Sequence, residues 1–188
     1  MTPGRDGRLR IPPPPPGLPR RLRAWYVVIA ASLSALIAAL PACPIQDGAG
    51  RPLWRVETVH DGDTVTCIDA ANQPQKIRLQ GIDAPEYDQP HGRESRQALA
   101  GKLAGGAVRV EGAARDQHGR LLGTLWIGAR NVNRELVAEG HAWVFGGFAP
   151  DPDLVSAEAE ARKARRGLWA APHPLAPRQW RAEHPSHR

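Results

Sequence analysis

Cysteine is scarce in this chain, whose 188 residues contain only Cys43 and Cys67. Two cysteines exclude a small domain stapled by several disulfides. A single bridge would have to join Cys43 to Cys67, which lies in a strand-like stretch of alternating side chains. A small buried thiol is therefore the better interpretation of Cys67. No internal repeat is present either, and the length suits one ordinary domain with an extension.

Net charge is also scarce once the N-terminal region is set aside. The whole chain carries a formal charge of +6, but residues 1–42 hold six of its 25 Lys and Arg side chains and one of its 19 Asp and Glu side chains. The remainder is therefore close to +1. A broad basic surface is not expected, so an anionic partner would have to be bound by a few local contacts.

The first 42 residues have the composition of a leader. Residues 1–23 are basic and include consecutive prolines from 12 to 16, which excludes a helix there. Residues 24–42 follow, and 24–40 carry no charge. A basic flank before an apolar run favours an export signal over a buried core helix. Simple cleavage, lipidation at Cys43 and an uncleaved membrane anchor through residues 24–40 all fit this pattern. We expect a protein that is exported and is periplasmic, extracellular or membrane-attached.

The pattern that follows predicts an α+β domain over residues 51–170. Five segments are rich in β-branched and aromatic residues and predict strands: 54–60, 64–69, 75–82, 108–110 and 121–127. Three segments have apolar residues at helical spacing or strong helix formers, and predict helices: 94–104, 131–140 and 154–166. The tail, residues 171–188, has three prolines between 172 and 177 and is expected to be irregular.

Four acidic residues lie in two short turn-like or strand-like motifs: Asp61 and Asp63 in the first, Asp83 and Glu86 in the second. Together they would repel one another unless a cation lay among them. No cysteine or histidine pair nearby offers the softer coordination that zinc prefers, so calcium or magnesium is expected. The alternative for Asp61 is that Asp61-Gly62 only makes a hairpin turn.

From about Trp54 to Trp169 the chain resembles the staphylococcal nuclease (thermonuclease) family. The resemblance rests on three short motifs and their order: Val-His-Asp-Gly-Asp-Thr at 59–64, Ile-Arg-Leu-Gln-Gly-Ile-Asp-Ala-Pro-Glu at 77–86, and Asp-Gln-His-Gly-Arg at 116–120. Gly-Leu-Trp at 167–169 adds a later structural match. The resemblance implies a five-stranded OB-fold β-barrel with about three helices. It also implies calcium-dependent cleavage of DNA and RNA with little sequence preference, and we expect a monomer.

The resemblance also implies roles for individual residues. Asp63 and Asp83 would give carboxylate oxygens, and Ala84 its backbone carbonyl, to Ca²⁺. Arg78 and Arg120 would hold the scissile phosphate, and Glu86 would be the general base. His118 stands where the family often has a tyrosine and would contact the substrate, while Asp61 would support the metal ligands from behind.

Each role has a simpler alternative. Arg78 would then only pair with Asp63 or Asp83, Glu86 would be a solvated loop acid, and Arg120 a charge at a strand edge. Phe145 and Phe148 offer a base a stacking surface, and core packing is the alternative for Phe145. For the whole chain, the alternatives are a non-catalytic OB-fold module that binds nucleic acid, and a membrane-tethered domain that uses calcium for structure or adhesion.

Overall fold

The fold is known from a computed structural model that describes residue 19 and residues 45–145 and 150–185. By its contacts the chain divides into two units, Met1–Cys43 and Pro44–Arg188. Apart from residue 19, the first unit lies outside the described residues, and so do the predicted leader, apolar segment and Cys43. In the described part of the chain, no helix combines the length and apolarity needed to cross a membrane.

Five strands close into a barrel, as predicted. They are β1 (Trp54–Val59), β2 (Thr64–Ile68), β3 (Pro74–Leu79), β5 (Ala107–Glu111) and β6 (Leu121–Ile127). Antiparallel pairing runs β3-β2-β1-β5-β6, and a parallel pairing of β3 with β6 closes the barrel. The α+β OB-fold prediction is confirmed. Three two-residue strands were not predicted: β4 (Ile82–Asp83) and β8 (Trp143–Val144), which pair with each other, and β7 (Arg130–Asn131).

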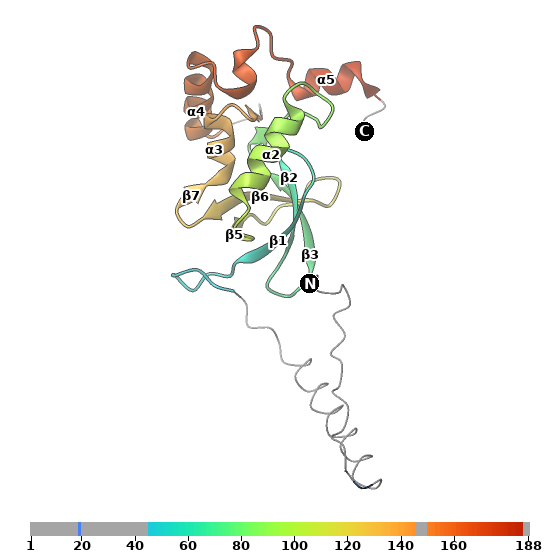
Figure 1. Cartoon of the computed structure of the whole chain (residues 1–188), viewed down its shortest axis with the longest axis vertical. Helices are drawn as coiled ribbons and strands as arrows, with labels where there is room; N and C mark the ends of the chain where they lie inside the picture. Colours follow the sequence, from blue (N-terminus) through green and yellow to red (C-terminus); the bar gives the residue numbers. More distant parts are fainter. Residues whose placement is uncertain (1–18, 20–44, 146–149, 186–188) are drawn as a thin grey trace. The chain divides into compact units, whose positions relative to one another are not determined.

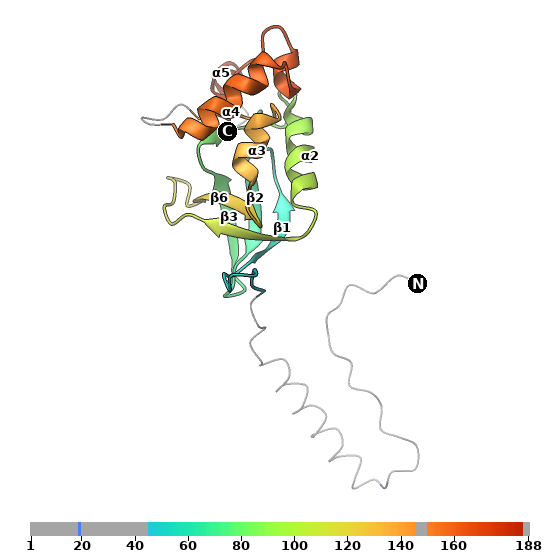
Figure 2. The ribbon, with the colours of Figure 1, turned by 90° about the vertical axis from the view of Figure 1, so that its left-hand side faces the viewer.

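The three predicted helices are present as α2 (Gly92–Lys102), α3 (Val132–Ala138) and α4 (Pro152–Lys163). They lie beside one another, with α3 between α2 and α4 (Figure 2). The sequence determines their ends locally. Asp151 caps α4 by accepting a hydrogen bond from the amide of Asp153, and Pro152 occupies the first turn. The segment after α3 turns at Gly140, whose φ of 76° suits glycine.

The C-terminal tail contradicts the prediction of an irregular segment. A 3₁₀ turn, Gly167–Ala170, precedes the tail, and the tail contains a helix, α5 (Pro177–Glu183). Pro177 occupies the first turn of α5, where a proline costs no hydrogen bond and its fixed φ suits the helix. The described residues thus hold four α-helices, one more than predicted. In the view of Figure 1, α5 lies at the upper right, near the N-terminal end of α2.

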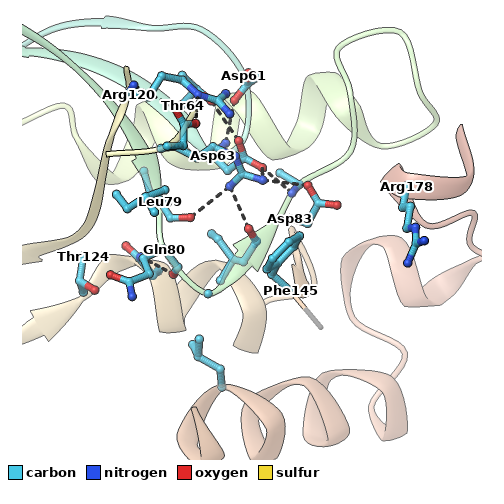
Figure 3. A pocket seen from close by; sticks show the side chains of 18 of the residues that line it. Asp61, Asp63, Thr64, Leu79, Gln80, Asp83, Arg120, Thr124, Phe145 and Arg178 are labelled. Atoms are coloured by element: carbon cyan, nitrogen blue, oxygen red, sulfur yellow. Dashed lines mark hydrogen bonds and ion pairs between the residues drawn. The ribbon is translucent and has the colours of Figure 1, made fainter. Parts of the chain in front are cut away.

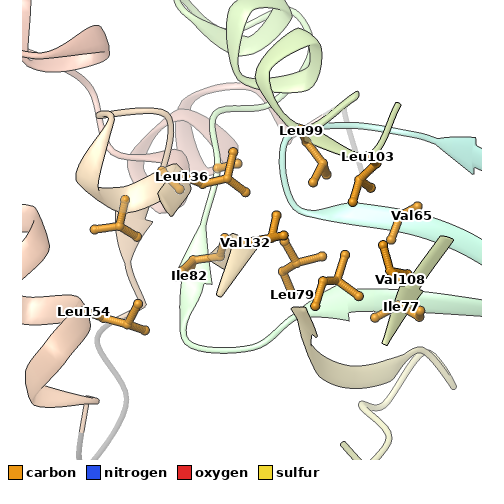
Figure 4. Close-up of a cluster of buried hydrophobic side chains, with 14 of the residues drawn as sticks. Val65, Ile77, Leu79, Ile82, Leu99, Leu103, Val108, Val132, Leu136 and Leu154 are labelled. Atoms are coloured by element: carbon orange, nitrogen blue, oxygen red, sulfur yellow. The ribbon is translucent and has the colours of Figure 1, made fainter. Parts of the chain in front are cut away.

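The core fills the barrel and continues under α2 and α3 (Figure 4). Its fully buried side chains include Val65, Ile77, Leu99, Leu125 and Leu136. Cys67 is also fully buried among them, and burial raises the pKa of its thiol to about 12. The prediction of a buried thiol is confirmed. The strands are therefore fixed in register by an apolar face, which leaves their opposite face available for polar side chains.

Candidate active site

Arg78 owes its position to the alternation of β3. Its neighbours Ile77 and Leu79 are buried in the core, so Arg78 points to the opposite face of the strand. There Nη1 of Arg78 donates to the carbonyl oxygens of Ile82 at 2.8 Å and Leu79 at 3.1 Å. These two bonds fix the plane of the guanidinium next to the turn between β3 and β4.

The same guanidinium lies between two buried carboxylates (Figure 3). Nη2 of Arg78 is 3.0 Å from Oδ2 of Asp63 and 2.8 Å from Oδ1 of Asp83. Asp63 follows the turn between β1 and β2, and Asp83 belongs to β4, so three separate segments meet at this point. The structure therefore brings Asp63, Asp83 and Arg78 together. The ion pair expected under the simpler interpretation of Arg78 is present as well.

Asp63 is held by the backbone as well as by Arg78. Its Oδ2 accepts a hydrogen bond from the amide of Ala84 at 2.6 Å, and its Oδ1 accepts one from the hydroxyl of Thr64 at 3.0 Å. Burial nevertheless raises the pKa of Asp63 to about 8, against the opposing effect of Arg78, and the negative charge of Asp61 adds to the rise. The charged form of Asp63 is thus under-compensated by the protein alone.

The carboxylate pair fits a hard divalent cation. Asp63 and Asp83 offer only oxygen atoms, and the raised pKa of Asp63 shows a site where added positive charge would be favourable. The described residues include no group of three or more His, Cys, Asp or Glu side chains that could hold a metal. Asp63 and Asp83 would hold the cation with backbone, water or phosphate oxygens. That the carbonyl of Ala84 is one of them stays a prediction.

Asp61 makes the turn that precedes Asp63. Its Oδ1 accepts a hydrogen bond from the amide of Asp63 at 2.9 Å, and its side chain also lines the cleft. Both interpretations of Asp61 are therefore compatible with its position, since the turn that it makes also sets the direction of Asp63.

Glu86 lies at the edge of the same site, next to a residue that the sequence did not predict. Its Oε1 is 2.7 Å from Nη1 of Arg181, on α5, and Nη2 of Arg181 is 2.9 Å from Oδ2 of Asp83. Burial alone would lower the pKa of Arg181, but its hydrogen bonds to Asp83 and Glu86 outweigh this and raise it. The guanidinium of Arg181 thus bridges Asp83, a candidate metal ligand, and Glu86, the candidate base.

Arg120 and His118 come from the loop between β5 and β6. Nε of Arg120 is 2.7 Å from Oδ2 of Asp116, and Oδ1 of Asp116 accepts the backbone amides of both His118 and Arg120 at 2.9 Å. Asp116 therefore shapes this loop and orients Arg120. His118 is exposed, and the pair of residues lines the same cleft as Asp63 and Asp83.

The cleft has a volume of about 1520 Å³ and collects all eight predicted site residues: Asp61, Asp63, Arg78, Asp83, Ala84, Glu86, His118 and Arg120. Phe145 also lines it and has 55 % of its surface exposed, so it does not pack in the core. Phe148 lies outside the described residues. Residues of the barrel, α4 and α5 line the cleft together.

Sequence reasoning missed the two arginines of the tail that line the cleft, Arg178 and Arg181, because it treated the tail as irregular. One signal was available: Pro177 followed by residues without glycine or proline is typical of a helix that begins at a proline. Nothing in the sequence indicated that this helix would meet Asp83, which lies 98 positions before Arg181.

Comparisons with known proteins agree with this geometry. Residues 76–171 match the model of the staphylococcal nuclease homologue family. Protein ParB of Escherichia coli is 40 % identical over 165 residues, which span 82 % of this chain and 89 % of the relative. An uncharacterized endonuclease of Haemophilus influenzae is 33 % identical over 156 residues, 83 % of this chain and 85 % of that protein. A probable staphylococcal-like nuclease of Oryza sativa, CAN3, is 38 % identical over 121 residues, 63 % of this chain and 32 % of the plant protein.

Proposed function

Because the chain belongs to the staphylococcal nuclease family and is a nuclease, we propose that it is a calcium-dependent endonuclease that hydrolyses DNA and RNA with little sequence preference. Membership of this nuclease family favours an enzyme over the alternative of a non-catalytic module that binds nucleic acid. The observation that carries the proposal is the position of Arg78 between the buried carboxylates of Asp63 and Asp83, with Glu86 in the same cleft.

The charge of the cleft supports a requirement for a cation. Its described lining includes five basic side chains and six acidic ones, namely Lys76, Arg78, Arg120, Arg178 and Arg181 against Asp61, Asp63, Asp83, Glu86, Asp116 and Asp151. A phosphodiester would therefore meet no excess of positive charge from the protein alone. Calcium held by Asp63 and Asp83 would supply the missing charge and polarise a phosphoryl oxygen.

The protein side chains then have distinct tasks. Arg78 and Arg120 present guanidinium groups that match the oxygens of a phosphate and stabilise the charge that accumulates as water attacks. Glu86 accepts the proton of that water, a step that is typically worth about 10²–10⁴ in rate. Exposed Phe145 gives a base a surface on which to stack, which suits flexible or single-stranded substrates.

The direct test uses the purified full-length chain with denatured DNA and with RNA, in calcium, magnesium or chelator. We expect digestion with calcium and none in chelator. Glu86→Gln should reduce the rate by about 10²–10⁴ with the fold intact by circular dichroism. Glu160→Gln, on an exposed position of α4 outside the cleft, is the matched control and should keep full activity. Undiminished cleavage in chelator would contradict the role of the metal.

We also propose that the nuclease is exported, on the sequence of the leader alone. A basic flank followed by the uncharged residues 24–40 supports this. Mass spectrometry of the N-terminus of protein recovered from cells distinguishes a cleaved signal, a lipidated Cys43 and an uncleaved anchor. A soluble, cytoplasmic chain that retains Met1 would contradict export.

A further inference from the structure

Helix α5 adds a cationic side chain to the site from outside the residues that match the family model. That match ends at residue 171, whereas α5 spans Pro177–Glu183. Arg181 is about one third exposed and contacts both carboxylate oxygens of Asp83, at 2.9 and 3.3 Å, as well as Glu86 at 2.7 Å. Its guanidinium thus lies between a candidate metal ligand and the candidate base.

A buried glutamine holds α5 in this position. Gln89 is 4 % exposed, and its Nε2 donates to the carbonyl of Leu175, just before α5, at 2.6 Å. Its Oε1 accepts the amide of Glu86 at 3.1 Å. Pro177, at the start of α5, is buried as well. Gln89 therefore joins the loop that carries Glu86 to the segment that carries Arg181. Its two hydrogen bonds hold α5 next to the site.

Arg178 precedes Arg181 by three positions, which places the two arginines on the same side of the helix. Both line the cleft, and Arg178 is exposed. In Figure 3, Arg178 lies on the opposite side of the cleft from Arg120. Two guanidinium groups thus extend the cleft beyond the residues already assigned to the scissile phosphate.

We propose that α5 forms a second wall of the substrate site, where Arg181 and Arg178 bind phosphates of the nucleic acid strand that flank the scissile one. Arg181 neutralises Asp83 and Glu86 until substrate arrives, and then exchanges these carboxylates for a phosphate. The proposal rests on the proposed function in one respect, the identity of the substrate as nucleic acid.

The exchange follows from the chemistry of the groups involved. A guanidinium fork that binds a carboxylate in a bidentate manner has the same match to two phosphate oxygens. A divalent cation at Asp83 would compete for the oxygens that Arg181 now contacts, and Glu86 needs to be released to accept a proton. Moving Arg181 to a phosphate frees Asp83 for the cation and Glu86 for the proton, while the guanidinium keeps an anionic partner.

The test is the salt dependence of binding to a short phosphorothioate oligo-dT in calcium, which keeps the phosphate charges while it slows cleavage. Each lost phosphate contact on a single strand reduces the slope of log K against log salt concentration by about 0.7. We expect this change for Arg178→Ala and for Arg181→Ala, and about twice as much for the double variant. Arg55→Ala removes an exposed arginine of β1 outside the cleft and should leave the slope unchanged.

A slope that is unchanged in the double variant, with the fold intact by circular dichroism, would overturn the proposal. Because Arg178 is exposed, its variant remains informative if Arg181→Ala unfolds. Calcium affinity without nucleic acid tests the exchange: Arg181→Ala should bind calcium more tightly, and weaker binding would refute a competition at Asp83. If the slopes change but the wild-type chain digests nothing in any cation, the proposed hydrolysis fails while α5 stays a binding wall.

Discussion

Asn133 offers a strong test of how the fold supports the site. It is 1 % exposed and lies in α3. Its Nδ2 donates to the carbonyl oxygens of Gln80 at 3.0 Å and Gly123 at 3.2 Å, and its Oδ1 accepts the amide of Leu125 at 3.1 Å. Gln80 belongs to the turn between Arg78 and Asp83, so one side chain ties this turn to β6 and α3.

The expected cost of Asn133→Ala follows from the groups that lose this partner. The carbonyl of Gly123 keeps a hydrogen bond from the amide of Gln80 at 2.8 Å. The amide of Leu125 loses its bond to Asn133 in a buried place, and the carbonyl of Gln80 loses its bond in a part-buried one. At about 1–3 kcal/mol for the buried amide and about 1 kcal/mol for the part-buried carbonyl, the free energy of unfolding should fall by roughly 2–4 kcal/mol. This is a large share of the total of about 5–15 kcal/mol that is usual for a domain.

Urea unfolding followed by tryptophan fluorescence measures this loss. Asn131→Ala serves as the comparison, since Asn131 caps α3 through the amide of Arg134 and should cost only about 0.5–2 kcal/mol. Under conditions where Asn133→Ala is folded, its cleavage rate should still fall, because the turn that spaces Arg78 from Asp83 has lost its support. A loss below about 0.5 kcal/mol, within the range of ordinary surface changes, would refute the reasoning.

Two further predictions concern the ends of α2. A Cβ at Gly92 would lie 1.8 Å from the carbonyl oxygen of Glu86, so Gly92→Ala should displace the Glu86 loop and reduce kcat at least about tenfold. The control is Gly101→Ala in the same helix, where a Cβ meets nothing within 4 Å. This substitution should be neutral or raise the free energy of unfolding by up to about 1 kcal/mol. Nε2 of His91 lies 3.0 Å from Nδ1 of His141, and burial lowers the pKa of both histidines. At His141 the charges of His91 and Lys102 lower the pKa further, while Glu139 and Glu94 oppose the change. At His91 the charge of Glu94 opposes it. The unfolded chain therefore takes up these protons first as the pH falls below about 6.5, so the histidines lower the free energy of unfolding there. Between neutral and mildly acidic pH the urea midpoint should fall further for wild type than for His141→Gln. An identical acid dependence of the two proteins would contradict this assignment.

Much of the barrel and its site was predictable because the pattern is local. Alternation along β3 places the aliphatic side chains of Ile77 and Leu79 in the core and Arg78 in the cleft. The pair Asp151-Pro152 likewise sets the start of α4. Local patterns carry no information about partners far away in sequence. The contacts of Arg181 with Asp83, and of Gln89 with Leu175, depend on how the tail packs, so they became visible only in the structure.

Short elements were missed for a related reason. Strands β4 and β8 have two residues each and are held by their mutual pairing, with Ile82 opposite Val144 and Asp83 opposite Trp143. No periodicity can be read from two residues. The four acidic residues of the two motifs line one cleft, but only Asp63 and Asp83 form ion pairs with Arg78.

The parallel pairing of β3 with β6 has a consequence for how the enzyme acquires its activity. Ile77 and Leu121 are partners about 44 residues apart along the chain, so this pairing carries a larger loop-closure entropy than the β1-β2 and β2-β3 hairpins. Arg78 pairs with Leu122 in the same ladder. The arginine at the centre of the site is thus held both by the β2-β3 hairpin, opposite Thr64, and by a pairing that closes a longer loop. Recovery of cleavage during refolding should therefore follow closure of the barrel rather than formation of its hairpins.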